Sequence, residues 1–307
     1  MGGTELLGRV DGLRAGRVPF VLATVVRAER PTSAKAGDRA LVLPDGTMEG
    51  FVGGSCAEST VRAQGLRLLS AGESALLRIT PTADEPEVTT EGLVTVGNPC
   101  LSGGVLEIFL EAMLPPTLVH VFGDAPVARA LVGVGQALEY DVRATTDPGA
   151  QIHPDTAAVV VASHGRDEES VLAAALLAGV GYVGLVASRR RGDAVLAALG
   201  VPAELAERVR TPAGLDLGAR APAEVALSIY AEIVASRPRP ATAPAAGPVP
   251  DLAAATATTD AVDPVCGMAV AVAEATPRLA HAGRTWYFCG SGCRRAFADS
   301  PGRYLYV

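Results

Sequence analysis

Three of the five cysteines lie near the C-terminal end of this 307-residue chain, and their spacing could hold a metal ion. Cys289 and Cys293 are four positions apart in CGSGC, and Cys266 lies upstream in DPVCGM. His281, on a strand-like segment, could supply a fourth ligand. Thiolates and an imidazole suit zinc, copper or another soft metal. The sequence therefore predicts a zinc or copper site, although a small aromatic-cored module with spare thiols would show the same pattern.

The segment that carries these thiols, residues 261–307, is small for an independent fold. Units below roughly 40–70 residues usually need a metal, disulfides or another staple. A structural zinc contributes on the order of 10–16 kcal/mol in zinc-finger peptides. We therefore expect this segment to fold around its metal ion.

The other two cysteines, Cys56 and Cys100, lie in glycine-rich turns and are candidate catalytic thiols. The capping-box pattern of Ser55–Glu58 places Cys56 in the first turn of a helix, where the helix dipole favours a thiolate. Gly53 and Gly54 would let a ligand approach the backbone closely. The alternative is that Cys56 is a small buried residue at a strand-to-helix junction, because cysteines without a disulfide are often buried.

A glycine turn after the strand-like LVHVF could bind a nucleotide-like ligand. Gly123 opens the turn GDAPVA, which leads into a helix whose N-terminus favours an anion. Asp147, at the end of the next expected strand, suits a ribose hydroxyl. Asp124, however, places a negative charge where a pyrophosphate would lie, which disfavours NAD(P). The alternative is plain packing of a strand against a helix.

A basic turn between another expected strand and helix is a candidate phosphate site. Ser188 precedes Arg189, Arg190 and Arg191, and cations at a helix N-terminus oppose the helix dipole unless an anion binds there. His164 ends a different strand, at the edge where doubly wound sheets bind ligands. A solvated basic turn and a capping histidine are the alternatives.

These candidate residues must be positioned by a fold. The pattern of expected strands and helices changes along the chain, which predicts more than one domain. Residues 1–114 alternate short strands, a hairpin with Asp45 and Gly46 at its turn, and one amphipathic helix, which indicates an α+β domain. Residues 115–236 alternate apolar strands with helices, which predicts a Rossmann-like, doubly wound parallel sheet. Residues 237–260 are rich in proline and alanine and read as a linker before the module of residues 261–307.

Composition and charge argue against some classes of protein. The formal net charge of −7 argues against a nucleic-acid partner, which usually meets a basic face. No apolar run approaches the roughly 20 residues that span a bilayer, and no secretory signal pattern stands at the N-terminus. We therefore expect a cytoplasmic protein whose cysteines are thiols or metal ligands rather than disulfides.

The C-terminal segment resembles the YHS domain family. DPVCGM, HAGRTWYFC, CGSGCRRAF and DSPGRYL carry the resemblance. It implies a small module related to heavy-metal-handling domains, and it carries Cys266, Cys289 and Cys293 over as metal ligands.

The preceding residues resemble the XdhC/CoxI family of accessory factors for xanthine dehydrogenase and carbon monoxide dehydrogenase. The resemblance rests on FVLATVVRAERPTSAKAGDRALVLPDGTMEGFVGGSCAES, HVFGDAPVARAL, GYVGLVASRRR and RVRTPAGLDLGARAPAEVALSIYAEIVA. By position, Cys56 matches a family cysteine and Gly123 the Rossmann turn, where relatives have GAGHVA. Ser188 to Arg191 match a GSRRR-like turn, whereas NPCLSGG around Cys100 departs from the family pattern.

This second resemblance implies a protein that binds molybdenum cofactor (molybdopterin), helps it gain its terminal sulfur and inserts it into an apo molybdenum hydroxylase. The sulfur would come through a cysteine desulfurase, and we expect a homodimer. The chain would then be an accessory protein more than an enzyme with turnover. Two other hypotheses stay open, an NAD(P)-dependent oxidoreductase and a copper chaperone that uses the Rossmann domain as a docking platform.

Overall fold

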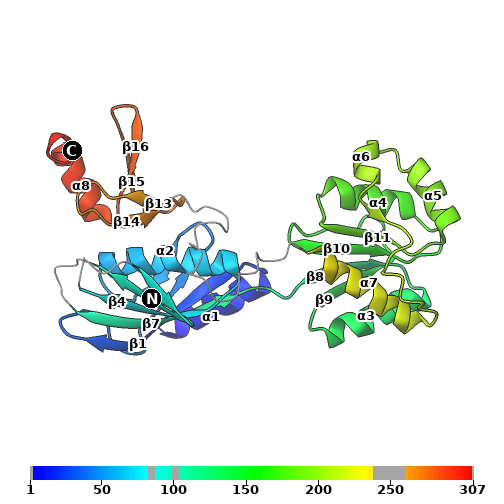
Figure 1. Cartoon of the computed structure of the whole chain (residues 1–307), viewed down its shortest axis with the longest axis horizontal. Helices are drawn as coiled ribbons and strands as arrows, with labels where there is room; N and C mark the ends of the chain where they lie inside the picture. Colours follow the sequence, from blue (N-terminus) through cyan, green and yellow to red (C-terminus); the bar gives the residue numbers. More distant parts are fainter. Residues whose placement is uncertain (1–2, 82–86, 99–103, 238–259, 306–307) are drawn as a thin grey trace. The chain divides into compact units, whose positions relative to one another are not determined.

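The chain forms two compact units, each with its own sheet and core (Figure 1). One unit comprises Met1–Pro115 together with Ala246–Val307, and the other comprises Pro116–Ala245. The computed structural model describes residues 3–81, 87–98, 104–237 and 260–305. The expected linker of residues 237–260 therefore lies almost wholly outside the described residues.

The first unit is built on a seven-stranded sheet in the order β3-β2-β1-β7-β4-β6-β5. Its neighbouring strands pair antiparallel, except that β4 and β6 run parallel. The bounds are β1 Phe20–Glu29, β2 Arg39–Val42, β3 Met48–Gly50, β4 Ala75–Thr80, β5 Val88–Thr90, β6 Leu93–Gly97 and β7 Val105–Met113. The expected hairpin is β2 and β3, with the Asp45 carboxylate accepting hydrogen bonds from the Thr47 N–H and hydroxyl at the turn.

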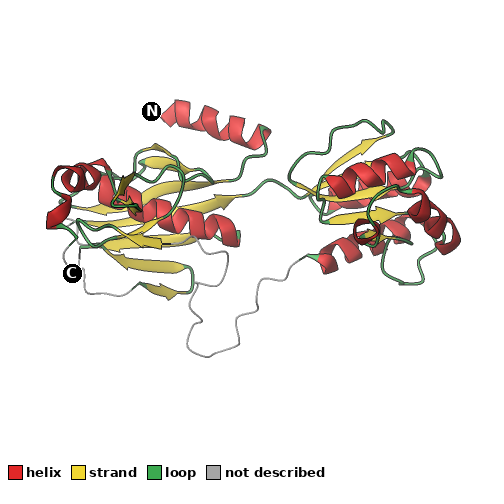
Figure 2. Cartoon of the chain, turned by 90° about the horizontal axis from the view of Figure 1, so that it is seen from above, coloured by secondary structure: helices red, strands yellow, loops and turns green. Residues whose placement is uncertain are grey.

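Helices pack on the two faces of this sheet, and Figure 2 shows one of them lying across the strands. Helix α2, Ser55–Ala71, packs on one face, and helix α1, Gly3–Ala15, packs on the other. Strand β1 serves both cores, because successive side chains of a strand point to opposite faces. Val21 and Ala23 face α2, while Phe20 joins the leucines of α1. The sheet thus forms the middle of three layers.

The C-terminal module of the first unit is a small aromatic fold. Its elements are β13 Asp260–Val262, β14 Ala269–Ala271, β15 Arg278–His281, β16 Arg284–Tyr287, α8 Ser291–Asp299 and the 3-10 turn η2 Pro301–Arg303. Phe297 of α8 is fully buried and contacts the rings of Trp286, Phe288 and Tyr304. This ring cluster holds the hairpin β15–β16 against the helix.

The module packs on helix α2 within the same unit. Ala271 of β14 is 4% exposed and belongs to the hydrophobic core that α2 forms with the large sheet. The Ala275 N–H donates a hydrogen bond of 3.1 Å to the Asp45 carbonyl. Arg67 of α2 pairs with Asp260 of β13. The module is therefore joined to the N-terminal domain by apolar contact as well as by polar bonds.

The second unit is a five-stranded parallel sheet in the order β12-β11-β10-β8-β9. Its strands are β8 Leu118–Phe122, β9 Asp141–Thr145, β10 Thr156–Val161, β11 Tyr182–Leu185 and β12 Val209–Arg210. Its helices are α3 Pro126–Ala137, α4 Glu168–Leu177, α5 Arg189–Ala198, α6 Ala203–Ala206 and α7 Pro222–Ser236.

The helices of this unit lie on both faces of the sheet, which confirms the predicted doubly wound, Rossmann-like fold. One core joins Val119 of β8 to α3 and α7, and the other joins Phe122 of the same strand to α4 and α5. Strands β9 and β10 follow each other in the chain but flank β8 on opposite sides. The carboxyl ends of β8 and β10 therefore mark the switch point where such sheets bind ligands. No helix among the described residues is long and apolar enough to cross a membrane.

Candidate functional site

Short turns of the C-terminal module bring three cysteines together. Cys266 lies in the turn between β13 and β14, and Cys289 follows β16. Gly290 caps α8, and Cys293 lies in the first turn of that helix. The Sγ atoms of Cys266 and Cys289 are 3.7 Å apart, and those of Cys289 and Cys293 are 3.5 Å apart. Segments that are distant in the sequence thus converge on one cluster.

The donor set of this cluster fits a soft metal ion. One oxygen of Asp263 and the three Sγ atoms all lie within 4.8 Å of one another. A tetrahedral zinc ion with Zn–S bonds of about 2.3 Å would hold its sulfurs roughly 3.8 Å apart. The observed sulfur separations are close to that value, so these residues could bind one ion with little rearrangement.

Asp263 is the member of the cluster that sequence reasoning missed. It is fully buried, and its carboxylate accepts hydrogen bonds of 2.8 Å from the N–H groups of Val265 and Cys289. It therefore ties the Cys266 turn to the Cys289 turn, and it could bind the ion or orient the thiols. The sequence feature that could have identified Asp263 is the Asp-Pro pair before Cys266, because an aspartate often caps the turn that follows it.

His281 lies elsewhere in the module, and it is not among the residues whose ligand atoms cluster. Its ring stands edge-on to Phe297, with centroids 5.7 Å apart. The structure thus brings together three of the four predicted metal ligands, with Asp263 in the fourth position.

The three thiols of the cluster differ in pKa. The hydrogen bond from Cys289 lowers the pKa of Cys266 to about 7. The same bond, together with burial, raises the pKa of Cys289 well above its usual range. Burial raises the pKa of Cys293 to about 12. Cys266, the exposed thiol, is therefore the most acidic of the three.

Cys56 lies in the first turn of α2, as the sequence predicted, but the capping box is wrong. Gly54, not Ser55, is the N-cap, and no side chain caps this end of the helix. Gly54 adopts an extended conformation, and the helix begins at Ser55, one residue earlier than the capping box predicted. Gly53 has φ of 135°, and a Cβ there would lie 3.0 Å from the Cβ of Ala57.

Asn98, at the end of β6, holds the backbone of Cys56. Its Nδ2 donates 3.1 and 3.0 Å hydrogen bonds to the Cys56 carbonyl and the Thr60 hydroxyl. Asn98 is 2% exposed. Cys100, two residues further along, lies outside the described residues.

The thiol-bearing turn of the module touches the N-terminus of α2. A Cβ added at Gly290 would lie 3.1 Å from the Cβ of Ser55, so the two backbones approach closely. Gly290 follows Cys289, and Ser55 precedes Cys56. The turn between Cys289 and Cys293 therefore lies against the first turn of α2, which carries Cys56.

In the second unit, Gly123 forms the tight turn after β8. It has φ of 122°, and a Cβ there would lie 2.3 Å from the Ala162 carbonyl oxygen, which only glycine avoids. Asp124, the next residue, forms an ion pair with Arg166. This pair spans the loops that follow β8 and β10, at the switch point. Asp124 therefore places a paired carboxylate beside the turn.

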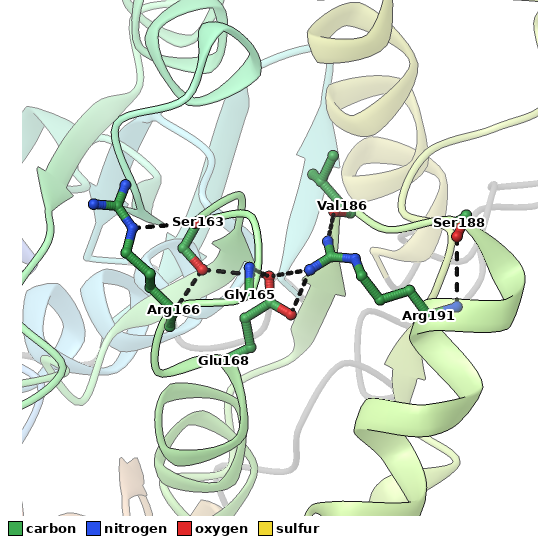
Figure 3. Close-up of polar contacts among 7 residues, drawn as sticks. All are labelled: Ser163, Gly165, Arg166, Glu168, Val186, Ser188 and Arg191. Carbon is green, nitrogen blue, oxygen red and sulfur yellow. Dashed lines mark hydrogen bonds and ion pairs between the residues drawn. The ribbon is translucent and has the colours of Figure 1, made fainter.

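The guanidinium of Arg191 forms hydrogen bonds with other groups of the second unit, as Figure 3 shows. Its Nη1 donates to both carboxylate oxygens of Glu168 at 2.8 and 2.9 Å, and its Nη2 donates to the Val186 carbonyl at 2.8 Å. Glu168 is fully buried, and it also accepts from the Gly165 N–H. The charge of Arg191 is thus balanced by a buried carboxylate.

The remaining residues of the basic turn are open to solvent. The Ser188 hydroxyl accepts a 3.4 Å hydrogen bond from the Arg191 N–H and caps α5, whereas Arg189 and Arg190 are exposed. His164 is exposed with φ of 56°, in the loop after β10. Asp147, also exposed, accepts a 2.9 Å hydrogen bond from the Gly149 N–H. An anion at this turn would therefore meet Arg189 and Arg190 rather than Arg191.

Models of known protein families match three successive parts of the chain. The model of the XdhC and CoxI family matches residues 13–80, the model of the XdhC Rossmann domain matches residues 119–233, and the model of the YHS domain matches residues 261–306. The chain is 28% identical over 246 residues to "Uncharacterized protein YqeB" of Escherichia coli (strain K12), covering 70% of this chain and 43% of that protein. The chain therefore spans less than half of that relative.

Two further relatives match different stretches. "Molybdenum cofactor insertion chaperone PaoD" of Escherichia coli (strain K12) is 24% identical over 281 residues, covering 76% of this chain and 88% of PaoD. A "Copper-transporting P-type ATPase" of Rhizobium leguminosarum bv. viciae is 46% identical over 43 residues, which are 14% of this chain and 5% of that protein.

Proposed function

The chain belongs to the XdhC and CoxI family and carries a C-terminal YHS domain, and from this premise we propose that it is a maturation factor for a molybdenum hydroxylase. It would bind molybdenum cofactor, assist its sulfuration and insert it into an apo hydroxylase of the xanthine or carbon monoxide dehydrogenase type. The observation that carries the proposal is the similarity to PaoD, a protein named for cofactor insertion, over 88% of the length of PaoD.

The second unit offers a place for the phosphate of the cofactor. The carboxyl edge of its parallel sheet is the ligand-binding edge of doubly wound folds. The N-terminus of α5 and the exposed side chains of Arg189 and Arg190 supply positive potential at that edge. A dinucleotide is a weaker candidate, because Pro126 removes an N–H from the start of α3 and Asp124 adds a carboxylate.

The first unit contains the thiol that we propose for the sulfuration step. The first turn of α2 favours the thiolate of Cys56, which a sulfur donor or acceptor would need. We propose that Cys56 assists sulfuration, with a cysteine desulfurase as the source of the sulfur. The partners would then be that desulfurase and the apo hydroxylase, and the protein would act as a homodimer.

The C-terminal module is proposed to hold one zinc or copper ion. Cys266, Cys289 and Cys293 would bind it, with Asp263 as a fourth ligand or as the group that orients the thiols. Such an ion would replace thiol protons and lock the two turns together. The similarity of this segment to part of a copper-transporting ATPase favours copper handling as a second candidate function.

One experiment tests the main proposal. Protein purified under anaerobic conditions is denatured, and the released small molecules are identified by mass spectrometry. Purified cofactor and apo hydroxylase are then incubated with and without the protein, and the molybdenum bound to the hydroxylase is measured. We expect pterin-containing cofactor in the first assay and faster loading in the second. Loading at the same rate with and without the protein would contradict the proposal.

A further inference from the structure

Two thiols of the C-terminal module are close enough to react with each other. The Sγ atoms of Cys266 and Cys289 are 3.7 Å apart, although the two residues are 23 positions apart in the chain. A disulfide bond is about 2.05 Å long, so the two sulfurs would have to approach by about 1.7 Å. The fold of the module therefore places a distant pair of thiols within a small movement of a covalent bond.

Hydrogen bonds among protein groups hold this pair together. The Asp263 carboxylate accepts from the Val265 N–H, beside Cys266, and from the Cys289 N–H, each at 2.8 Å. The Asp263 N–H donates to the Met268 carbonyl at 2.8 Å and closes the turn that contains Cys266. These bonds use only groups of the chain, so they keep the two thiols neighbours independently of a bound ion.

The two thiols differ in their access to solvent. Cys266 is exposed, whereas Cys289 is 5% exposed and Cys293 is half-buried. Oxidation of a thiol by peroxide follows its exposure, so a small oxidant in solution meets Cys266 first. Gly267, the next residue, has φ of 76°, which suits a turn that can adjust its backbone. The exposed thiol thus has a buried thiol beside it as its reaction partner.

We propose that the module responds to hydrogen peroxide by forming a disulfide between Cys266 and Cys289, with release of the bound metal ion. The Cys266 sulfur attacks the peroxide, the O–O bond breaks, and a sulfenic acid and a first water form. The Cys289 sulfur then attacks the sulfenic sulfur and displaces a second water. The two thiolates lose two electrons, the peroxide is reduced, and two solvent protons complete the waters.

This reaction removes two of the metal ligands and leaves Cys293 and Asp263. A structural zinc site needs four ligands, so the remaining pair cannot retain the ion. The disulfide joins the same two turns that the ion would join, and it therefore takes over as the staple of the module. The release of metal rests on the proposed metal site, whereas formation of the disulfide does not.

The test uses the full-length protein, reduced and then either metal-free or loaded with Zn(II). Each sample receives one equivalent of hydrogen peroxide, free thiols are blocked, and tryptic peptides are analysed by mass spectrometry. Trypsin cuts after Arg278 and Arg284, so Cys266 and Cys289 fall in different peptides, whereas Cys293 shares residues 285–294 with Cys289. We expect a cross-linked peptide pair in both samples, which a dithiol reductant removes, and zinc release from the loaded sample, measured with a chromogenic chelator.

Two variants identify the partner of Cys266. Cys289→Ser should lower the yield of the cross-link at least about tenfold, because the neighbouring sulfur is gone. Cys293→Ser is the matched control and should keep the cross-link. The opposite result in this pair of variants would overturn the inference, as would a Cys266 that stays reduced in the unmodified protein.

Limited proteolysis of the unmodified protein tests the exchange of staples. The oxidised module should resist protease at least about tenfold longer than the reduced, metal-free module. Digestion of both at the same rate, or zinc that stays bound beside a complete cross-link, would contradict the exchange. If the reduced protein takes up no zinc, the proposed metal site fails, and the cross-link in the metal-free sample still decides whether the disulfide forms.

Discussion

At the scale of single residues, neighbouring arginines have different surroundings and should have different roles. The guanidinium of Arg191 neutralises the buried Glu168, whereas Arg190 is exposed. Arg191→Ala would leave a buried carboxylate without its partner, which costs about 3–5 kcal/mol. We therefore expect a large loss in the free energy of unfolding of the second unit, measured by urea titration.

Arg190→Ala is the counterpart of Arg191→Ala, and it tests whether the exposed arginine binds an anion. It should leave the free energy of unfolding unchanged within about 0.5 kcal/mol, because the side chain is exposed. It should weaken cofactor binding at least about tenfold, measured by calorimetry, because a charge-assisted contact contributes about 1.5–3 kcal/mol. Equal stability losses in the two variants would show that Arg191 has no special structural role.

The thiol cluster makes a second prediction at this scale. Cys289→Ser removes the central thiol, which neighbours both other sulfurs, so metal content should fall from about one ion per chain to a small fraction of that. Cys56→Ser, the control, should retain the ion, because Cys56 is not among the clustered ligands. The metal content of both variants is measured by mass spectrometry. A Cys289→Ser protein with full metal content would refute the assigned site.

His120 should make the second unit sensitive to acid. It lies in β8, is 7% exposed, and burial lowers its pKa below the ordinary value of 6.5. The unfolded chain therefore binds a proton more readily than the folded one. The stability from neutral His120 is complete above pH 6.5 and is lost as the pH falls through that value toward the folded pKa.

The measurement is Tm as a function of pH. We expect Tm of the second unit to fall as the pH drops below 6.5, and His120→Phe to flatten this part of the curve. His164→Asn, at an exposed position that is not among the groups shifting the pKa of His120, should leave the slope as it is. A slope that His120→Phe does not reduce would assign the acid sensitivity to other groups.

At the scale of elements, the contact between α2 and β14 decides whether the module and the N-terminal domain behave as one unit. Ala271 contributes its methyl group to the core beneath α2. Ala271→Asp would bury a charge there, and we expect a loss of about 3 kcal/mol or more together with faster proteolysis of the module. Ala280→Asp, on an exposed position of β15, should have little effect. Equal resistance of both variants to protease would mean that the module does not depend on α2.

At the scale of the whole molecule, the two units should respond differently to metal removal. The module's core is a few aromatic rings around Phe297, which is little apolar burial for an independent fold. A chelator should therefore loosen the module and change the fluorescence of Trp286, the only tryptophan. The thermal transition of the second unit should not move, because the clustered ligands all belong to the module. Unchanged Trp286 fluorescence after complete metal removal would contradict a structural metal.

The sequence by itself determined the elements and their order. Periodicity of apolar residues is a local property, so it predicted the parallel sheet after residue 115 and the helix that carries Cys56. Local spacing likewise singled out Cys289 and Cys293, because the glycine turn between them lets two thiols four positions apart meet. The glycine at position 123 was identified because a tight turn after a strand needs that residue type.

The tertiary structure alone decided which side chains meet. Asp263 joins the thiols and His281 packs on Phe297, because the fold of the hairpins fixes distances that sequence spacing does not. Arg191 is neutralised by Glu168, a residue 23 positions earlier, so a run of three arginines became one structural and two exposed cations. A cavity of about 340 Å³ beside Asn98 has walls from β6, α2 and the C-terminal module. Contacts between such distant segments depend on packing in three dimensions, and no local pattern encodes them.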